Sequence, residues 1–171
     1  HCSVAENMSH IAEIIEYAKK ENLPVRAYIS CVLGCPYEGE ISAEKVAAQA
    51  AELYRLGCYE ISLGDTIGVG TPFKTLHLIE TVKKSVPIEK IAVHFHDTYG
   101  QALVNIYAAL SLGVAVVDSS VAGLGGCPYA KGAAGNVATE DLIYMLNGMQ
   151  IKTGVDLEKL IDVGKYISKI T

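Results

Sequence analysis

The sequence predicts an α/β protein in which helices alternate with the strands of a parallel β-sheet. Four β-rich runs, with midpoints near residues 29, 61, 93 and 117, recur roughly every 24–33 residues, and a helical stretch follows each of them. This spacing is typical of repeated βα units. The strand runs are apolar on both faces, as expected of parallel strands that helices cover. Four such units build either an open, doubly wound sheet or half of an eight-stranded barrel.

The first expected helix begins with a capping box, because Ser3 precedes Glu6 by three residues. Apolar residues then recur at helical spacing, and the basic residue Lys20 closes the helix. A β-rich run at 25–32 follows and ends in the turn-prone segment Gly34-Cys35-Pro36. These features predict the first helix and the first strand.

The second helix is expected over 42–56, with Gly57 as its stop. The second strand is expected at 58–63, where β-branched and other apolar residues predominate. Thr71 and Pro72 then predict the start of the third helix, because proline suits the first helical turn.

The third strand is expected at 91–94, and the helix after it ends at Gly113. The fourth strand is expected at 114–118. Two short helices finish the chain, with Thr139 and Asp156 as the expected N-caps.

Residues able to carry chemistry follow the carboxyl end of each expected strand. That edge holds the active site of a barrel and the ligand crevice of an open parallel sheet. The residues are Gly34-Cys35-Pro36, Gly64-Asp65-Thr66, His94 with His96, and Ser119-Ser120.

Composition excludes several functional classes. The 171 residues are 50% hydrophobic, enough for one core, and their net charge of −5 argues against a nucleic-acid-binding surface. No apolar run reaches the length of a membrane span, and the N-terminus resembles neither a signal peptide nor a presequence. Five cysteines, an odd number, favour free thiols in a reducing compartment.

The glycine-rich segment 119–139 is long for a connection inside a compact domain. It contains five glycines and one cysteine, Cys127, and has almost no charge. Connections of this length are usually functional or disordered, and the apolar residues within it argue against disorder. It is therefore either a mobile active-site loop that carries a thiol or a connector whose cysteine is a small buried hydrophobe.

His94 and His96 lie two residues apart in an expected strand, so both imidazoles can face one point. They form either a metal site or a hydrogen-bonded core histidine beside an exposed one. Zn²⁺ would take Cys127 as a third ligand, whereas Mg²⁺ or Mn²⁺ would take oxygen donors such as that of Asn136 and leave the thiol free. For Asp65, three roles remain open: metal ligand, acceptor that orients a ligand, or loop cap.

Five segments together resemble the hydroxymethylglutaryl-CoA lyase family. They are CVLGCPYEG at 31–39, YEISLGDTIGVGTP at 59–72, HFHDTYGQAL at 94–103, SVAGLGGCPYAKGAAGN at 120–136 and NVATEDLIYML at 136–146. The resemblance implies an eight-stranded (β/α) barrel, of which this chain supplies strands five to eight and the C-terminal helices. Residues 1–171 would then be one domain, the C-terminal part of the barrel.

The resemblance also implies the site. The implied metal ligands are His94, His96 and Asn136, which would bind Mg²⁺ or Mn²⁺; the implied catalytic residues are Cys127, Asp65 and His94; the implied loop and substrate residues are Gly125, Gly126 and Ser62. The family's Arg-Asp-Gly motif at the end of the first strand supplies a further ligand and an essential arginine, and nothing in this chain matches it.

The implied reaction is metal-dependent cleavage of 3-hydroxy-3-methylglutaryl-CoA to acetyl-CoA and acetoacetate. The alternatives are an incomplete barrel that acts only with a partner, and a related acyl-CoA-condensing synthase or aldolase. The expected partners are an acyl-CoA thioester and, when the enzyme is intact, a second copy, with neither nucleic acid nor membrane. The expected compartment is the cytoplasm in a bacterium or the mitochondrial matrix in a eukaryote, and no targeting region is expected in this chain.

Overall fold

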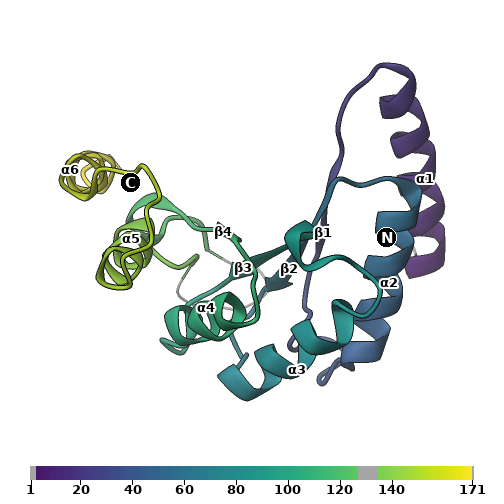
Figure 1. Ribbon diagram of the computed structural model, residues 1–171, viewed down its shortest axis with the longest axis horizontal. Coiled ribbons are helices and arrows are strands. Elements are labelled where there is room, and N and C mark those ends of the chain that lie inside the picture. The colour runs from purple at the N-terminus through teal and green to yellow at the C-terminus, as the bar shows by residue number, and fades with distance from the viewer. Residues whose placement is uncertain (1–2, 127–134, 171) are drawn as a thin grey trace.

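The computed structural model describes residues 3–126 and 135–170. Helices alternate with four strands along the chain (Figure 1). The elements are α1 (Val4–Lys20), β1 (Arg26–Ile29), α2 (Ala43–Leu56), β2 (Glu60–Asp65), α3 (Pro72–Val82), the 3₁₀ turn η1 (Ile88–Lys90), β3 (Ile91–Phe95), α4 (Ala102–Ser111), β4 (Val116–Asp118), the 3₁₀ turn η2 (Val121–Gly123), α5 (Thr139–Gly148) and α6 (Leu157–Ile167).

The four strands form one parallel sheet in the order β1-β2-β3-β4. A doubly wound sheet would reverse its strand order at a switch point. Here each strand pairs with the next strand along the chain, as in a barrel. The order therefore favours the half-barrel over the open sheet, and it leaves β1 and β4 at the two edges.

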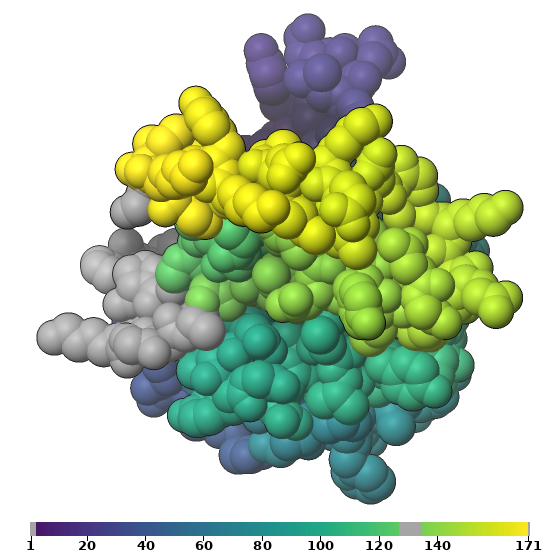
Figure 2. Space-filling view, turned by 90° about the vertical axis from the view of Figure 1, so that its left-hand side faces the viewer, coloured from purple at the N-terminus to yellow at the C-terminus, as the bar shows by residue number. Residues whose placement is uncertain are grey.

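Helices α2, α3 and α4 lie side by side along one face of the sheet, and α5 and α6 continue the row beyond β4 (Figures 1 and 2). On this face the strands contribute fully buried side chains such as Leu63, Val93 and Phe95. Because side chains alternate along a strand, Ser62 and His94 turn to the opposite face. Among the described residues, no helix combines the length and the hydropathy that a membrane crossing requires.

The capping signals in the sequence are largely correct. Ser3 and Glu6 form both hydrogen bonds of the capping box, and Asp156 accepts a hydrogen bond from the N–H of Lys159 at the start of α6. Gly57 ends α2 in the left-handed conformation, with φ of 106°. These local predictions are confirmed because they depend on residues only a few positions apart.

One predicted cap is wrong. Thr139 is the first residue of α5 rather than its N-cap, and its hydroxyl instead lies 2.9 Å from that of Ser119. Thr71 does occupy the N-cap position of α3, but its side chain makes no capping hydrogen bond. The first strand is also shorter than the expected 25–32, since β1 ends at Ile29 and Cys31 has a positive φ of 61°.

Candidate functional site

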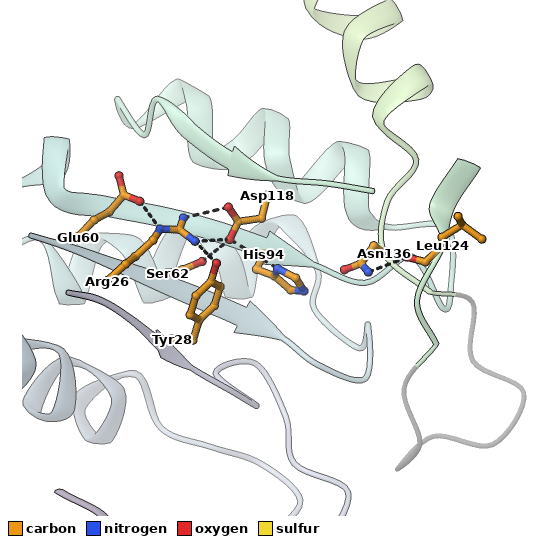
Figure 3. A network of polar contacts seen from close by, with 8 residues as sticks. All are labelled: Arg26, Tyr28, Glu60, Ser62, His94, Asp118, Leu124 and Asn136. Carbon is orange, nitrogen blue, oxygen red and sulfur yellow. Dashed lines mark hydrogen bonds and ion pairs between the residues drawn. The ribbon is translucent and has the colours of Figure 1, made fainter. Parts of the chain in front are cut away.

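The face of the sheet turned away from the helices carries a polar network that spans all four strands (Figure 3). Arg26 of β1 reaches across to β4, where its two terminal nitrogens donate to the carboxylate oxygens of Asp118 at 3.0 and 2.9 Å. The Nε of Arg26 donates to Glu60 on the neighbouring strand β2. The hydroxyl of Ser62 donates to the Oδ2 atom of Asp118 at 2.8 Å.

Both members of the Arg26–Asp118 pair stay charged. Burial alone would raise the pKa of Asp118, but its contacts with His94, Arg26 and Ser62 hold the pKa well below its usual range. Burial alone would lower the pKa of Arg26, whereas its two carboxylate partners raise it. The pair therefore places a positive charge from β1 next to a negative charge on β4, on the face of the sheet turned away from the helices.

His94 and His96 meet at the carboxyl end of β3. His94 is in register with Gly64 of β2 and Asp118 of β4, and Gly64 has no side chain to fill the space beside it. The ring centroids of the two histidines lie 5.5 Å apart. Burial and the neighbouring His94 lower the pKa of His96, so its ring is neutral and keeps a lone pair.

Asn136 lies beside His96, with which it forms an antiparallel bridge. Its Nδ2 donates to the carbonyl oxygen of Leu124 at 2.9 Å, which fixes the orientation of the amide. Gly125 makes this approach possible, because a Cβ there would lie 2.8 Å from Nδ2. The Oδ1 atom of Asn136 is consequently turned the other way.

These residues fit a divalent cation. The Oδ1 atom of Asn136 and the Nδ1 atom of His96 are buried and have no hydrogen-bond partner among the described residues, and the ring of His94 lies beside that of His96. Buried polar atoms are nearly always paired, so unpaired acceptors point to a ligand. Two imidazoles and an amide oxygen form a mixed nitrogen and oxygen donor set of the kind that binds divalent cations. The set is incomplete, since no three His, Cys, Asp or Glu side chains within 3–126 and 135–170 are grouped to hold a metal.

Asp65 has the contacts of a loop cap. It is fully buried at the end of β2, and its carboxylate accepts hydrogen bonds from the N–H groups of Val69 and Gly70 at 3.2 and 2.8 Å. Burial raises the pKa of Asp65, against the lowering effect of these N–H groups. By strand alternation its side chain shares the helix-covered face with Leu63, opposite to the face of His94. Asp65 thus shapes the turn after β2.

The structure brings together only some of the predicted site residues. Ser62 is buried and joins the network through Asp118, whereas Gly125 and Gly126 are exposed. Cys127 lies outside the described residues. A cavity of about 720 Å³ lies elsewhere, between α4 and α5 on the outer side of β4.

The sequence reasoning missed three charged residues of the network: Arg26, Glu60 and Asp118. The available signal was their position. Each is a charged residue inside a run expected to be an apolar, helix-covered strand, and such residues need a partner when buried.

Comparison with known proteins gives a consistent result. A family model described as HMGL-like matches residues 1–167. The chain is 60% identical over 167 residues to a mitochondrial hydroxymethylglutaryl-CoA lyase from Gallus gallus, covering 98% of this chain and 56% of that protein. It is 59% identical over 169 residues to a cytoplasmic 3-hydroxy-3-methylglutaryl-CoA lyase from Rattus norvegicus, covering 99% of this chain and 49% of that protein.

A crystal structure of hydroxymethylglutaryl-CoA lyase from Pseudomonas aeruginosa matches the fold with a TM-score of 0.96 and 58% identity, over 99% of this chain and 56% of that one. The chain thus has the TIM-barrel-like α/β fold of these relatives, with four parallel strands. It spans about half the length of the relatives that it matches.

Proposed function

The chain belongs to the HMGL-like family, and we propose that it is the metal-binding half of a hydroxymethylglutaryl-CoA lyase. The observation that carries the proposal is the meeting of His94, His96 and Asn136 at the carboxyl end of β3, where His96 and Asn136 each have a buried acceptor atom without a partner among the described residues. The substrate would be 3-hydroxy-3-methylglutaryl-CoA, and the products would be acetyl-CoA and acetoacetate.

The chain would provide strands five to eight of the barrel, as one domain over residues 1–171. Consecutive strand order and two sheet edges support this placement. The upstream half would supply the first four strands, including the Arg-Asp-Gly motif that has no counterpart here. In such a barrel the polar inner face would lie in the interior, and the carboxyl ends of the strands would form the site.

We assign Mg²⁺ or Mn²⁺ to His94, His96 and Asn136. The cation, when bound, polarises the tertiary hydroxyl of the substrate and lowers its pKa. His96 is suited to this site because its ring is neutral, and Asn136 because Leu124 holds its amide with Oδ1 free. His94 would bind the cation and would also lie next to the reacting hydroxyl of the substrate.

The reaction requires one proton to leave and one to arrive. Loss of the hydroxyl proton allows the bond between the carbinol carbon and the α-carbon of the thioester to break, which leaves the ketone of acetoacetate and the enolate of acetyl-CoA. Cys127 would donate the proton that converts this enolate to acetyl-CoA. Gly125 and Gly126 would let the segment that carries the thiol lie close to the substrate.

Asp65 and Ser62 would contribute less directly. Asp65 fixes the turn at 66–70 beside the site, and Ser62 holds Asp118. The complete enzyme would be a homodimer. Relatives include both mitochondrial and cytoplasmic lyases of animals. For this chain the compartment would be the cytoplasm in a bacterium and the mitochondrial matrix in a eukaryote.

A product assay tests the proposal. Residues 1–171, joined to the upstream half of the barrel, are expected to convert 3-hydroxy-3-methylglutaryl-CoA with Mn²⁺ into acetyl-CoA and acetoacetate in equal amounts. Chelation with EDTA should abolish the reaction, and Mn²⁺ should restore it. Condensation of acetyl-CoA with an oxo acid and release of free CoA by hydrolysis of the thioester, with no carbon–carbon cleavage of 3-hydroxy-3-methylglutaryl-CoA, would instead identify a condensing synthase and contradict the proposal.

A further inference from the structure

Arg26 is positioned to hold other protein groups rather than substrate. Its guanidinium donates to both oxygens of Asp118, to Glu60 and to the hydroxyl of Tyr28, and it also lies 4.7 Å from the centre of the Tyr28 ring. An arginine has five N–H donors, and these contacts occupy four of them. Nearly all hydrogen-bond donors of Arg26 are therefore used by protein groups, and its main partner is the carboxylate of Asp118.

Asp118 is in turn held on both of its oxygens. Arg26 occupies each oxygen, and Ser62 adds a second donor to Oδ2. Such bidentate, charge-assisted contacts fix both the position and the plane of a carboxylate. Asp118 is thus a rigid acceptor at the end of β4, although it belongs to the shortest strand of the sheet.

The Oδ2 atom of Asp118 lies 3.5 Å from the Nδ1 atom of His94 (Figure 3). Nδ1 is buried and has no other polar partner within the described part of the chain, and the edge-to-face contact with Tyr28 restrains the ring from a second side. A neutral imidazole carries one proton, and the nitrogen that holds it is decided by the acceptor nearby. A carboxylate beside Nδ1 favours the proton there and leaves the lone pair on Nε2.

We propose that Asp118, held by Arg26 and Ser62, is a positioning residue that keeps the proton of His94 on Nδ1 and presents Nε2 as a metal donor. The inference rests on the proposed function, because it assigns an orienting partner to one of the proposed ligands. Metal-binding histidines commonly donate their second ring N–H to a carboxylate, and loss of that partner typically costs about 10–100-fold in metal affinity or activity.

The first test needs no mutation and no metal. In the complete protein that carries residues 1–171, labelled with ¹⁵N-histidine and freed of metal, NMR correlations at the ring nitrogens report which nitrogen carries the proton. At a pH where the ring is neutral, His94 is expected to show a proton on Nδ1. A majority of the tautomer with the proton on Nε2 would overturn the inference.

The second test compares two variants of the same network. Asp118→Asn removes the charged acceptor, and Mn²⁺ affinity measured by calorimetry is expected to fall about 10–100-fold, with a mixed tautomer at His94. Tyr28→Phe removes one partner of Arg26 but leaves every contact of Asp118, and its Mn²⁺ affinity should stay within about 2-fold of the unmodified protein. Equal affinities in both variants, with an unchanged tautomer, would overturn the inference.

The two proposals fail in different ways. If the unmodified protein binds no Mn²⁺, the proposed metal site is wrong, and the proposed function is wrong with it. If the unmodified protein binds Mn²⁺ and Asp118→Asn changes neither the affinity nor the tautomer of His94, only the role proposed for Asp118 is wrong. If Asp118→Asn does not fold, the tautomer of the unmodified, metal-free protein decides the question.

Discussion

Residues 1–171 alone are expected to cleave 3-hydroxy-3-methylglutaryl-CoA on the order of 10⁴-fold or more slowly than the complete barrel. The isolated chain lacks the Asp and Arg of the first-strand motif, so the cation loses a carboxylate and the reacting oxygens lose a positive partner. Removal of one preorganised electrostatic contact commonly costs about 10²–10³-fold in rate, and here two are removed together.

The isolated chain is also expected to associate with itself. β1 and β4 leave two sheet edges without a neighbouring strand, and such edges template association. Beside β4, the cavity between α4 and α5 is lined by Val117, Leu142 and Ile143, which adds apolar surface next to the free edge.

Size-exclusion chromatography and a rate assay with Mn²⁺ measure both effects. Addition of a separately expressed N-terminal half of a family member, chosen because it bears the Arg-Asp-Gly motif, should raise the rate. The control is the same fragment with its motif arginine changed to glutamine, which should restore assembly but not the rate. A monomeric chain 1–171 that turns over at ordinary enzyme rates would contradict the half-barrel.

Replacement of Cys127 by serine is expected to slow turnover in the complete barrel by about 10²–10⁴-fold, because a hydroxyl is a much weaker acid than a thiol and general acid catalysis contributes this much. Mn²⁺ affinity should not change, since the thiol lies outside the proposed ligand set. The measurement is kcat at saturating thioester, together with a Mn²⁺ titration.

Cys58→Ala is the matched control for this variant. Cys58 is buried just before the amino end of β2, at the opposite end of the strand from the proposed site, so it lies out of reach of the substrate. Its kcat per folded molecule should remain close to that of the unmodified protein. Unmodified turnover in Cys127→Ser would exclude the thiol as the proton donor.

The parts of the fold that depend on local sequence could be predicted. The alternation of strands and helices, the capping box at Ser3, and the stop at Gly57 each follow from a few neighbouring residues. It was harder to predict from the sequence which face of the sheet a strand residue occupies. Asp65 is the last residue of β2 and His94 the last but one of β3, and the register Gly64↔His94 turns them to opposite faces.

The polar network was hidden from the sequence because its partners lie far apart in the chain. Arg26 and Asp118 are separated by 92 positions, so their places inside apolar strand runs indicate that each needs a partner but not which residue that partner is. The pair of histidines was easier to find, since residues two apart on a strand share a face whatever the tertiary structure. The position of Asn136 beside the histidines could not be derived from local spacing, because it depends on the bridge between His96 and Asn136, which are far apart in the chain.

The measurement that tests the central claim most directly is pulsed electron paramagnetic resonance of Mn²⁺ bound to the complete barrel with ¹⁵N-labelled histidine. The proposed site predicts nitrogen couplings from two imidazoles, and one coupling should disappear in His96→Ala and the other in His94→Ala. Bound Mn²⁺ without any histidine coupling would contradict the assignment of the metal to this chain.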